Sequence, residues 1–116
     1  MKIPIARLAS QLILPLWLGF DLKAADQFEK ETLTYKEVGP LSIKADVYHY
    51  NDAGVRPVVV SLHGGALMMG HRENFSGPVK NFALTNGYVL VSFDYRLAPE
   101  TKLPAIIEDV EDAFRW

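Results

Sequence analysis

Two short, continuously apolar runs constrain this chain more than any other feature of its sequence. Val58–Leu62 and Tyr88–Phe93 are rich in β-branched residues, and each run contains a single serine. Strands that are buried on both faces have this composition, and such strands usually lie in parallel sheets under helices. Between the runs, Pro78–Asn86 suits a short helix, with a proline for its first turn and Gly87 to end it. The sequence therefore predicts a β-α-β unit with a right-handed crossover.

An antiparallel pair of strands is predicted before this unit. Leu33–Val38 mixes apolar and polar residues, and Gly39-Pro40 is typical of a turn. Every second residue from Leu41 to Val47 is apolar, and the residues between them, Asp46 included, are polar. A period of two predicts one buried face and one wet face.

A last helix is predicted to begin at Pro104, with Ile106 and Ala113 on one face. We interpret the acidic residues in its middle as a solvated face; they are Glu108, Asp109, Glu111 and Asp112. The predicted fold class is therefore α/β, an antiparallel strand pair followed by parallel β-α-β-α, with an incomplete sheet.

Two loops follow the predicted parallel strands, at the carboxyl end of each. His63–Gly70 follows the first strand, and the polar connection Asp94–Lys102 follows the second. Open α/β sheets bind their ligands at this edge. We therefore expect the two loops to lie along one candidate active edge.

The first loop has the glycine spacing of a phosphate-binding loop, from Gly65 to Gly70. That motif continues with a lysine and a serine or threonine, but here His71 and Arg72 follow. Without the lysine and the magnesium-binding hydroxyl group, a phosphate site is not expected.

The start of this loop, His63-Gly64-Gly65-Ala66, favours a different chemistry. Two glycines after a buried strand allow a sharp turn that leaves amide hydrogens pointing outward. Such amides can stabilise the negative oxygen that develops during acyl transfer. A tight turn that merely leads into the helix is the simpler alternative.

A second motif gives the loop its context. The run Asp94-Tyr-Arg-Leu-Ala-Pro-Glu100, followed by Leu103-Pro-Ala105, lies about thirty residues after the His-Gly-Gly sequence. Together the two motifs closely resemble the α/β-hydrolase superfamily, in particular carboxylesterases and lipases of the hormone-sensitive lipase type and their small esterase relatives. The resemblance covers about residues 32–116 and implies that the His-Gly-Gly loop supplies the oxyanion-hole amides.

The resemblance also implies roles for single residues. Gly65 and Ala66 are the expected amide donors, and Gly64 is expected to make the turn. The family often has a third glycine where this chain has Ala66, whose Cβ restricts the backbone. His63 is expected to order the loop by bonding nearby backbone rather than to act as the catalytic base. Structural roles are also expected for four residues of the second motif: Asp94, Tyr95, Arg96 and Glu100. Met68 and Met69 are candidates for the mouth of an acyl pocket, with simple packing as the alternative.

The catalytic groups that the resemblance implies are missing from this chain. The family's nucleophile is the serine of a Gly-x-Ser-x-Gly elbow, and its acid and histidine follow that serine. No such elbow occurs here, and Ser61 and Ser92 fall inside predicted strands. We therefore expect residues 25–116 to be the amino-terminal portion of a longer serine carboxylesterase that needs no metal or organic cofactor, and the chain alone to be inactive. A peptidase or amidase on the same fold, and a truncated non-catalytic product, are the alternatives.

Composition excludes several other classes of function. The chain has 12 basic and 14 acidic residues, a net charge of −2, so no basic excess favours nucleic acid. It has no cysteine, which excludes disulfides, thiolate metal sites and a cysteine nucleophile. A small-molecule ester is the expected partner, and the sequence does not fix the oligomeric state.

The first 24 residues have features of a secretory signal: two early positive charges, a short apolar middle and small residues after it. The apolar stretch is too short to span a membrane, which takes about 20 residues. An amphipathic helix that packs on the domain as part of a lid is the alternative. A cleaved signal would make the protein secreted or periplasmic, and otherwise a cytoplasmic location is expected.

Overall fold

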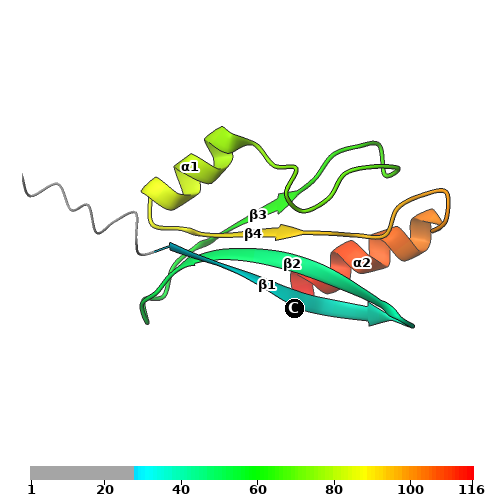
Figure 1. Cartoon of the computed structure of the whole chain (residues 1–116), viewed down its shortest axis with the longest axis horizontal. Helices are drawn as coiled ribbons and strands as arrows, with labels where there is room; N and C mark the ends of the chain where they lie inside the picture. The colour runs from blue at the N-terminus through cyan, green and yellow to red at the C-terminus, as the bar shows by residue number, and fades with distance from the viewer. Residues whose placement is uncertain (1–27) are drawn as a thin grey trace, which may run out of the picture.

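Strand β4 (Val89–Phe93) organises the sheet, because it pairs with a neighbour on each side. The computed structural model describes residues 28–116, so the signal segment predicted for residues 1–24 lies outside the described part. The four strands lie in the order β1-β2-β4-β3 (Figure 1). β4 pairs in parallel with β3 (Val58–Leu62) and antiparallel with β2 (Leu41–Tyr50). The predicted parallel pair is confirmed.

The predicted antiparallel pair is also present, and its strands are longer than expected. β1 (Phe28–Val38) pairs with β2 along its whole length, with one irregularity between Thr34 and Lys36. Gly39 has a φ of 57° in the connecting turn, a left-handed conformation that glycine adopts without steric cost.

The two helices cover opposite faces of the sheet (Figure 1). α1 (Gly77–Thr85) packs Ala83 against Leu90 of β4, and α2 (Leu103–Arg115) packs Ala113 against Val91 and Phe93. Neighbouring residues of β4 thus contribute to two separate cores, which explains why this strand is apolar apart from Ser92. Neither helix is long and apolar enough to cross a membrane.

Asp46 of β2 corrects the predicted wet face, because its side chain is fully buried. The loop that precedes α1 lies over this face of the sheet and brings Arg72 within 2.8 Å of the Asp46 carboxylate. Lys30 Nζ lies 2.8 Å from the same carboxylate, and the Thr32 hydroxyl donates to it at 2.7 Å. The alternation predicts a polar face correctly, but a second layer covers that face.

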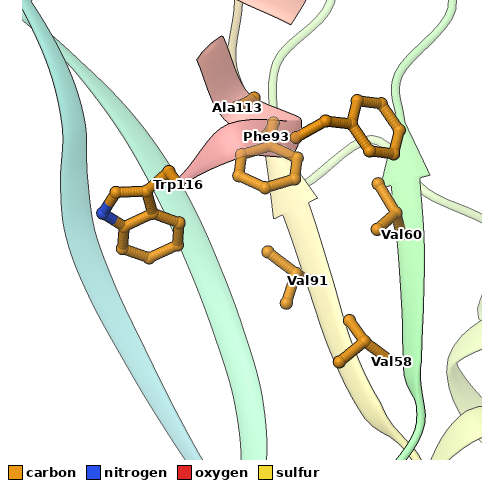
Figure 2. Close-up of a pocket in the computed structure, with 7 residues that line it drawn as sticks. Val58, Val60, Val91, Phe93, Ala113 and Trp116 are labelled. Carbon is orange, nitrogen blue, oxygen red and sulfur yellow. The ribbon is translucent and has the colours of Figure 1, made fainter. Parts of the chain in front are cut away.

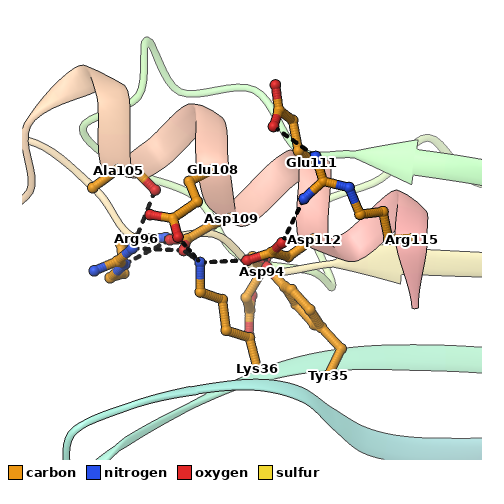
Figure 3. A network of polar contacts seen from close by, with 10 residues as sticks. All are labelled: Tyr35, Lys36, Asp94, Arg96, Ala105, Glu108, Asp109, Glu111, Asp112 and Arg115. Carbon is orange, nitrogen blue, oxygen red and sulfur yellow. Dashed lines mark hydrogen bonds and ion pairs between the residues drawn. The ribbon is translucent and has the colours of Figure 1, made fainter.

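Asp109 of α2 corrects the predicted solvated acidic face in the same way. Its side chain is fully buried and accepts two side-chain hydrogen bonds of 2.7 Å from Arg96, while Lys36 Nζ of β1 lies 2.9 Å away (Figure 3). Glu108 and Glu111 are exposed, as expected. Asp109 lies three residues after the buried Ile106 and therefore on the same face of the helix.

The prediction that β3 is buried on both faces is also wrong, because the strand is less buried than its composition predicts. It lies at the edge of the described sheet, and Val58, Val60 and Leu62 remain exposed. An apolar groove of about 380 Å³ lies beside it, between β3, β4 and the end of α2 (Figure 2). Exposed apolar strand edges favour association with other chains.

Replacing Asp109 with asparagine tests the buried ion pairs. Asp109→Asn leaves the partly buried Arg96 without its carboxylate and leaves Lys36 with Asp112, so we expect a loss of about 3 kcal/mol in the free energy of unfolding. Urea denaturation followed by circular dichroism measures it. Glu108→Gln is the control: Glu108 is exposed and lies 3.6 Å from Lys36. An equal effect of both substitutions would contradict the importance of the buried carboxylate.

The same carboxylates predict how stability depends on pH. Burial opposes ionisation of Asp46 and Asp109, but hydrogen bonds from neighbouring side chains outweigh it and lower both pKa values. Because the folded pKa values lie below the unfolded ones, the unfolded chain binds protons first as the pH falls. We expect the free energy of unfolding to be level above about pH 5 and to fall steadily below about pH 4. A rise in stability on acidification, in the same urea experiment, would refute this.

The exposed edge predicts that the 116-residue chain associates in solution. Val60→Lys places a charge at the centre of the apolar edge and should increase the monomer fraction measured by sedimentation velocity. Val55→Lys is the control, since Val55 is fully exposed in the loop before β3. A wild-type chain that stays monomeric at tens of micromolar would count against association through this edge.

Candidate active site

The connections that leave β3 and β4 lie in direct contact, at the carboxyl ends of the two parallel strands. The Tyr95 hydroxyl donates to the His63 carbonyl at 2.7 Å, and the Ala98 amide donates to the Leu67 carbonyl at 2.8 Å. The two loops that the sequence assigns to one edge of the sheet therefore meet there, at the position where α/β sheets hold ligands.

The first of these loops turns through three successive residues with positive φ. Gly65 has a φ of 115°, Ala66 of 54° and Leu67 of 63°, so the turn begins one residue later than the expected position, Gly64. A Cβ at Gly65 would lie 2.0 Å from the Met69 carbonyl oxygen, so only glycine fits there. Left-handed backbone at Ala66 and Leu67 is unfavourable for residues with a Cβ, and such strain is concentrated at functional sites.

The amides of this turn are free to bind a ligand. Within residues 28–116, the amides of Gly64, Gly65 and Ala66 donate no hydrogen bond to the protein. Gly65 is half-buried, whereas the residues on either side of it are exposed. Successive amides around a left-handed turn form a concave site that suits an anion or a developing negative oxygen.

His63 is held against the backbone of the loop. Its side chain is 5% exposed and stacks on the Tyr95 ring, with 4.2 Å between the centroids and 8° between the planes. Its Nδ1 lies 2.8 Å from the Gly64 carbonyl oxygen. Since a carbonyl oxygen only accepts, Nδ1 carries the proton. A Cβ at Gly70 would lie 2.4 Å from this nitrogen, so the end of the loop also closes around the ring.

The charged residues of the second motif form ion pairs that fix the connection after β4. Asp94 accepts hydrogen bonds from the Arg72 amide and guanidinium, each at 2.7 Å, and Arg96 binds Asp109 (Figure 3). The Asp109 carboxylate raises the pKa of Arg96, which keeps the guanidinium charged. Glu100 is exposed at the end of the turn.

An apolar surface follows the free amides. Leu67, Met68 and Met69 are consecutive and exposed, with 60% of Met68 and 65% of Met69 accessible. The Met68 and Met69 amides both donate to the Gly65 carbonyl, at 3.0 and 3.1 Å, so the two side chains start directly beside the turn. Methionine adapts to apolar groups of varied shape. No three His, Cys, Asp or Glu residues of the described chain are grouped to hold a metal ion.

Sequence reasoning missed two residues that shape this site. In the sequence, Arg72 is notable only as a departure from the phosphate-loop motif, yet it joins Asp46 on the sheet to Asp94 after β4. Leu67 carries one of the left-handed conformations and the carbonyl that Ala98 binds. The carboxylates of Asp46 and Asp94, for which the sequence suggests no partner, are a usable signal for Arg72, whereas a leucine with positive φ leaves no signal in a sequence.

Comparison with known proteins identifies the fold family. The BD-FAE family model matches residues 45–116, more than half of the chain. Esterase LipI from Mycobacterium tuberculosis is 43% identical over 65 residues, which cover 56% of this chain and 20% of that protein. The non-reducing polyketide synthase Preu6 from Preussia isomera is 33% identical over 96 residues, which cover 80% of this chain and 4% of that protein. The chain thus spans a small part of these curated relatives.

Comparison with solved structures leads to the same fold family. The hyperthermophilic esterase from the archaeon Pyrobaculum calidifontis has a TM-score of 0.66 and 40% identity, covering 81% of this chain and 31% of that one. A thermostable carboxylesterase cloned from a metagenomic library has a TM-score of 0.65 and 35% identity, covering 76% and 30%. The chain therefore belongs to the BD-FAE family, with the amino-terminal portion of an α/β-hydrolase fold and relatives among the carboxylesterases of the hormone-sensitive lipase type.

Proposed function

We propose that this chain supplies the oxyanion-hole loop of a serine carboxylic-ester hydrolase. The observation that carries the proposal is the pair of free amides at Gly65 and Ala66, held in a left-handed turn at the carboxyl end of β3. The similarity to esterases supports an ester as the substrate. No cofactor enters this reaction, which uses a serine, a histidine and an acid.

The turn acts on the charge that develops during the reaction. When a serine attacks an ester carbonyl, the carbonyl oxygen becomes an oxyanion. The Gly65 and Ala66 amides are already oriented, so they stabilise this oxygen without reorganising as solvent would. One such donor changes the rate by about 100- to 1,000-fold.

The nucleophile is proposed to come from chain beyond Trp116. Among residues 28–116, Ser92 is fully buried on β4 and donates to the Arg72 carbonyl, while Ser61 lies within β3. His63, which precedes the free amides, has its Nδ1 bonded to the Gly64 carbonyl. No serine of residues 28–116 lies in a Gly-x-Ser-x-Gly elbow, so the proposal takes the attacking serine and its base from elsewhere.

The exposed apolar side chains beside the turn suit the acyl group of the substrate. Met68 and Met69 follow the oxyanion donors after Leu67, and their amides bind the Gly65 carbonyl, so an ester whose carbonyl oxygen binds the free amides would have its acyl chain near them. The proposed substrate is an ester with a small apolar acyl group, such as an acetyl ester.

Reading the coding sequence beyond the Trp116 codon tests the proposal first. We expect an open frame with a Gly-x-Ser-x-Gly elbow within roughly 25–45 codons, followed by aspartate or glutamate and histidine. The complete product should hydrolyse p-nitrophenyl acetate and leave acetanilide, the corresponding amide, largely intact. A product that ends at Trp116, or one that cleaves only the amide, would refute an ester hydrolase.

Gly65→Ala in that product tests the turn itself. The new Cβ collides with the Met69 carbonyl and displaces the donors, so we expect kcat to fall by at least about 100-fold. Gly77→Ala is the matched control, because a Cβ at this position at the start of α1 has nothing within 4 Å. Both variants are compared by their rates and by their melting temperatures. Equal kcat values for Gly65→Ala and Gly77→Ala would show that the turn has no part in the mechanism.

A further inference from the structure

The proposed oxyanion donors lie between two carbonyl groups that the second connection holds. On one side, the Tyr95 hydroxyl binds the His63 carbonyl; on the other, the Ala98 amide binds the Leu67 carbonyl. Gly65 and Ala66 are flanked by these anchors. The connection after β4 therefore sets where the turn begins and where it ends.

The direction of each donor follows from the rigidity of the peptide unit. The Gly64 carbonyl and the Gly65 N–H belong to one planar trans peptide and point in opposite directions. His63 Nδ1 donates to that carbonyl at 2.8 Å and so fixes the direction of the Gly65 N–H. In the next unit, the Gly65 carbonyl accepts from two amides of the loop and fixes the Ala66 N–H in the same way.

Tyr95 holds His63 at two points. Its hydroxyl binds the backbone carbonyl of His63, and its ring stacks on the imidazole at 4.2 Å. Both side chains are buried, with 8% of Tyr95 and 5% of His63 exposed. Burial raises the pKa of Tyr95, so the hydroxyl stays protonated and remains a donor at neutral pH.

From this chain of contacts we propose that Tyr95 is a positioning residue for the oxyanion hole. It acts through His63 and the Gly64 carbonyl on the N–H of Gly65 and does not touch the substrate. The inference rests on the proposed function, because it assigns Tyr95 a part in that same site. Its strongest support is the left-handed backbone at Ala66 and Leu67, an unfavourable conformation that persists only where the surroundings hold it.

Tyr95→Phe in the complete product is the test. Phenylalanine keeps the stacked ring and removes the hydroxyl group, so we expect kcat for p-nitrophenyl acetate to fall about five- to tenfold, with KM unchanged within about twofold. Tyr50→Phe is the matched control. It also removes a hydroxyl that donates to a backbone carbonyl, that of Leu84, but at the end of α1.

A loss confined to kcat in Tyr95→Phe, with Tyr50→Phe at the wild-type rate, supports the proposal. Unchanged kcat in Tyr95→Phe, or an equal loss in both variants, overturns it. If the wild-type product does not hydrolyse esters at all, the proposed function fails, and a measurement independent of activity then decides the positioning role.

That measurement is the tautomer of His63, read from the ¹⁵N chemical shifts of its ring at about pH 8. We expect the Nδ1–H form in the wild type and in Tyr50→Phe, because the bond to the Gly64 carbonyl selects it. Tyr95→Phe should raise the Nε2–H population at least about twofold, as one weakened hydrogen bond permits. An identical tautomer in all three proteins would show that Tyr95 does not position the ring.

If Tyr95→Phe does not fold, a fluorinated tyrosine at position 95 replaces it. This analogue keeps the ring and the hydroxyl, but the hydroxyl ionises at lower pH than in tyrosine. Once ionised it cannot donate to the His63 carbonyl, so kcat should fall as the pH rises through its pKa, and the wild type should show no such fall. Superimposable pH profiles for the two proteins would refute the role of the hydroxyl.

Discussion

The Asp109 carboxylate ties together three parts of the chain that are distant in sequence. It lies on α2, receives two side-chain hydrogen bonds from Arg96 in the connection after β4, and faces Lys36 of β1. A buried charge of this kind is tolerated only with several partners, and here every partner comes from a different element. The position of α2 therefore fixes the connection, and the connection holds the turn that carries the free amides.

The sequence was sufficient to predict the antiparallel and the parallel strand pair, and which two loops meet at one edge of the sheet. Continuous apolar residues in β4 require cover on both faces, and the two helices provide it. The glycines after β3 and the polar run after β4 were correctly placed at one edge of the sheet, because parallel strands end together. Such predictions succeed when a sequence pattern is compatible with a single arrangement. The alternation within β2, for example, determines which of its residues face the core.

The predictions of burial were wrong where burial depends on a loop or helix that covers the sheet. The alternation of β2 shows that Asp46 is on the polar face, but not that Arg72 covers this face. Continuous apolar residues in β3 indicate a strand made for burial, yet within residues 28–116 no element covers its outer edge. Asp109 was different, because its spacing from Ile106 already placed it on the buried face of α2. The many acidic residues around Asp109 suggest a solvated face, but the helical spacing from Ile106 is the more informative signal and indicates burial.

Gly65 and Gly70 begin and end the same loop, and each lacks a Cβ for a separate reason. Gly65 makes room for the Met69 carbonyl, and Gly70 for the His63 ring and the Gly64 carbonyl. The loop therefore closes on its own backbone, while the side chains between the glycines point mostly into solvent. Substitutions of those side chains can adapt the loop to other acyl groups, but an insertion or deletion would break the contacts that close the loop. Between these two glycines the side chains can vary, whereas the number of residues cannot.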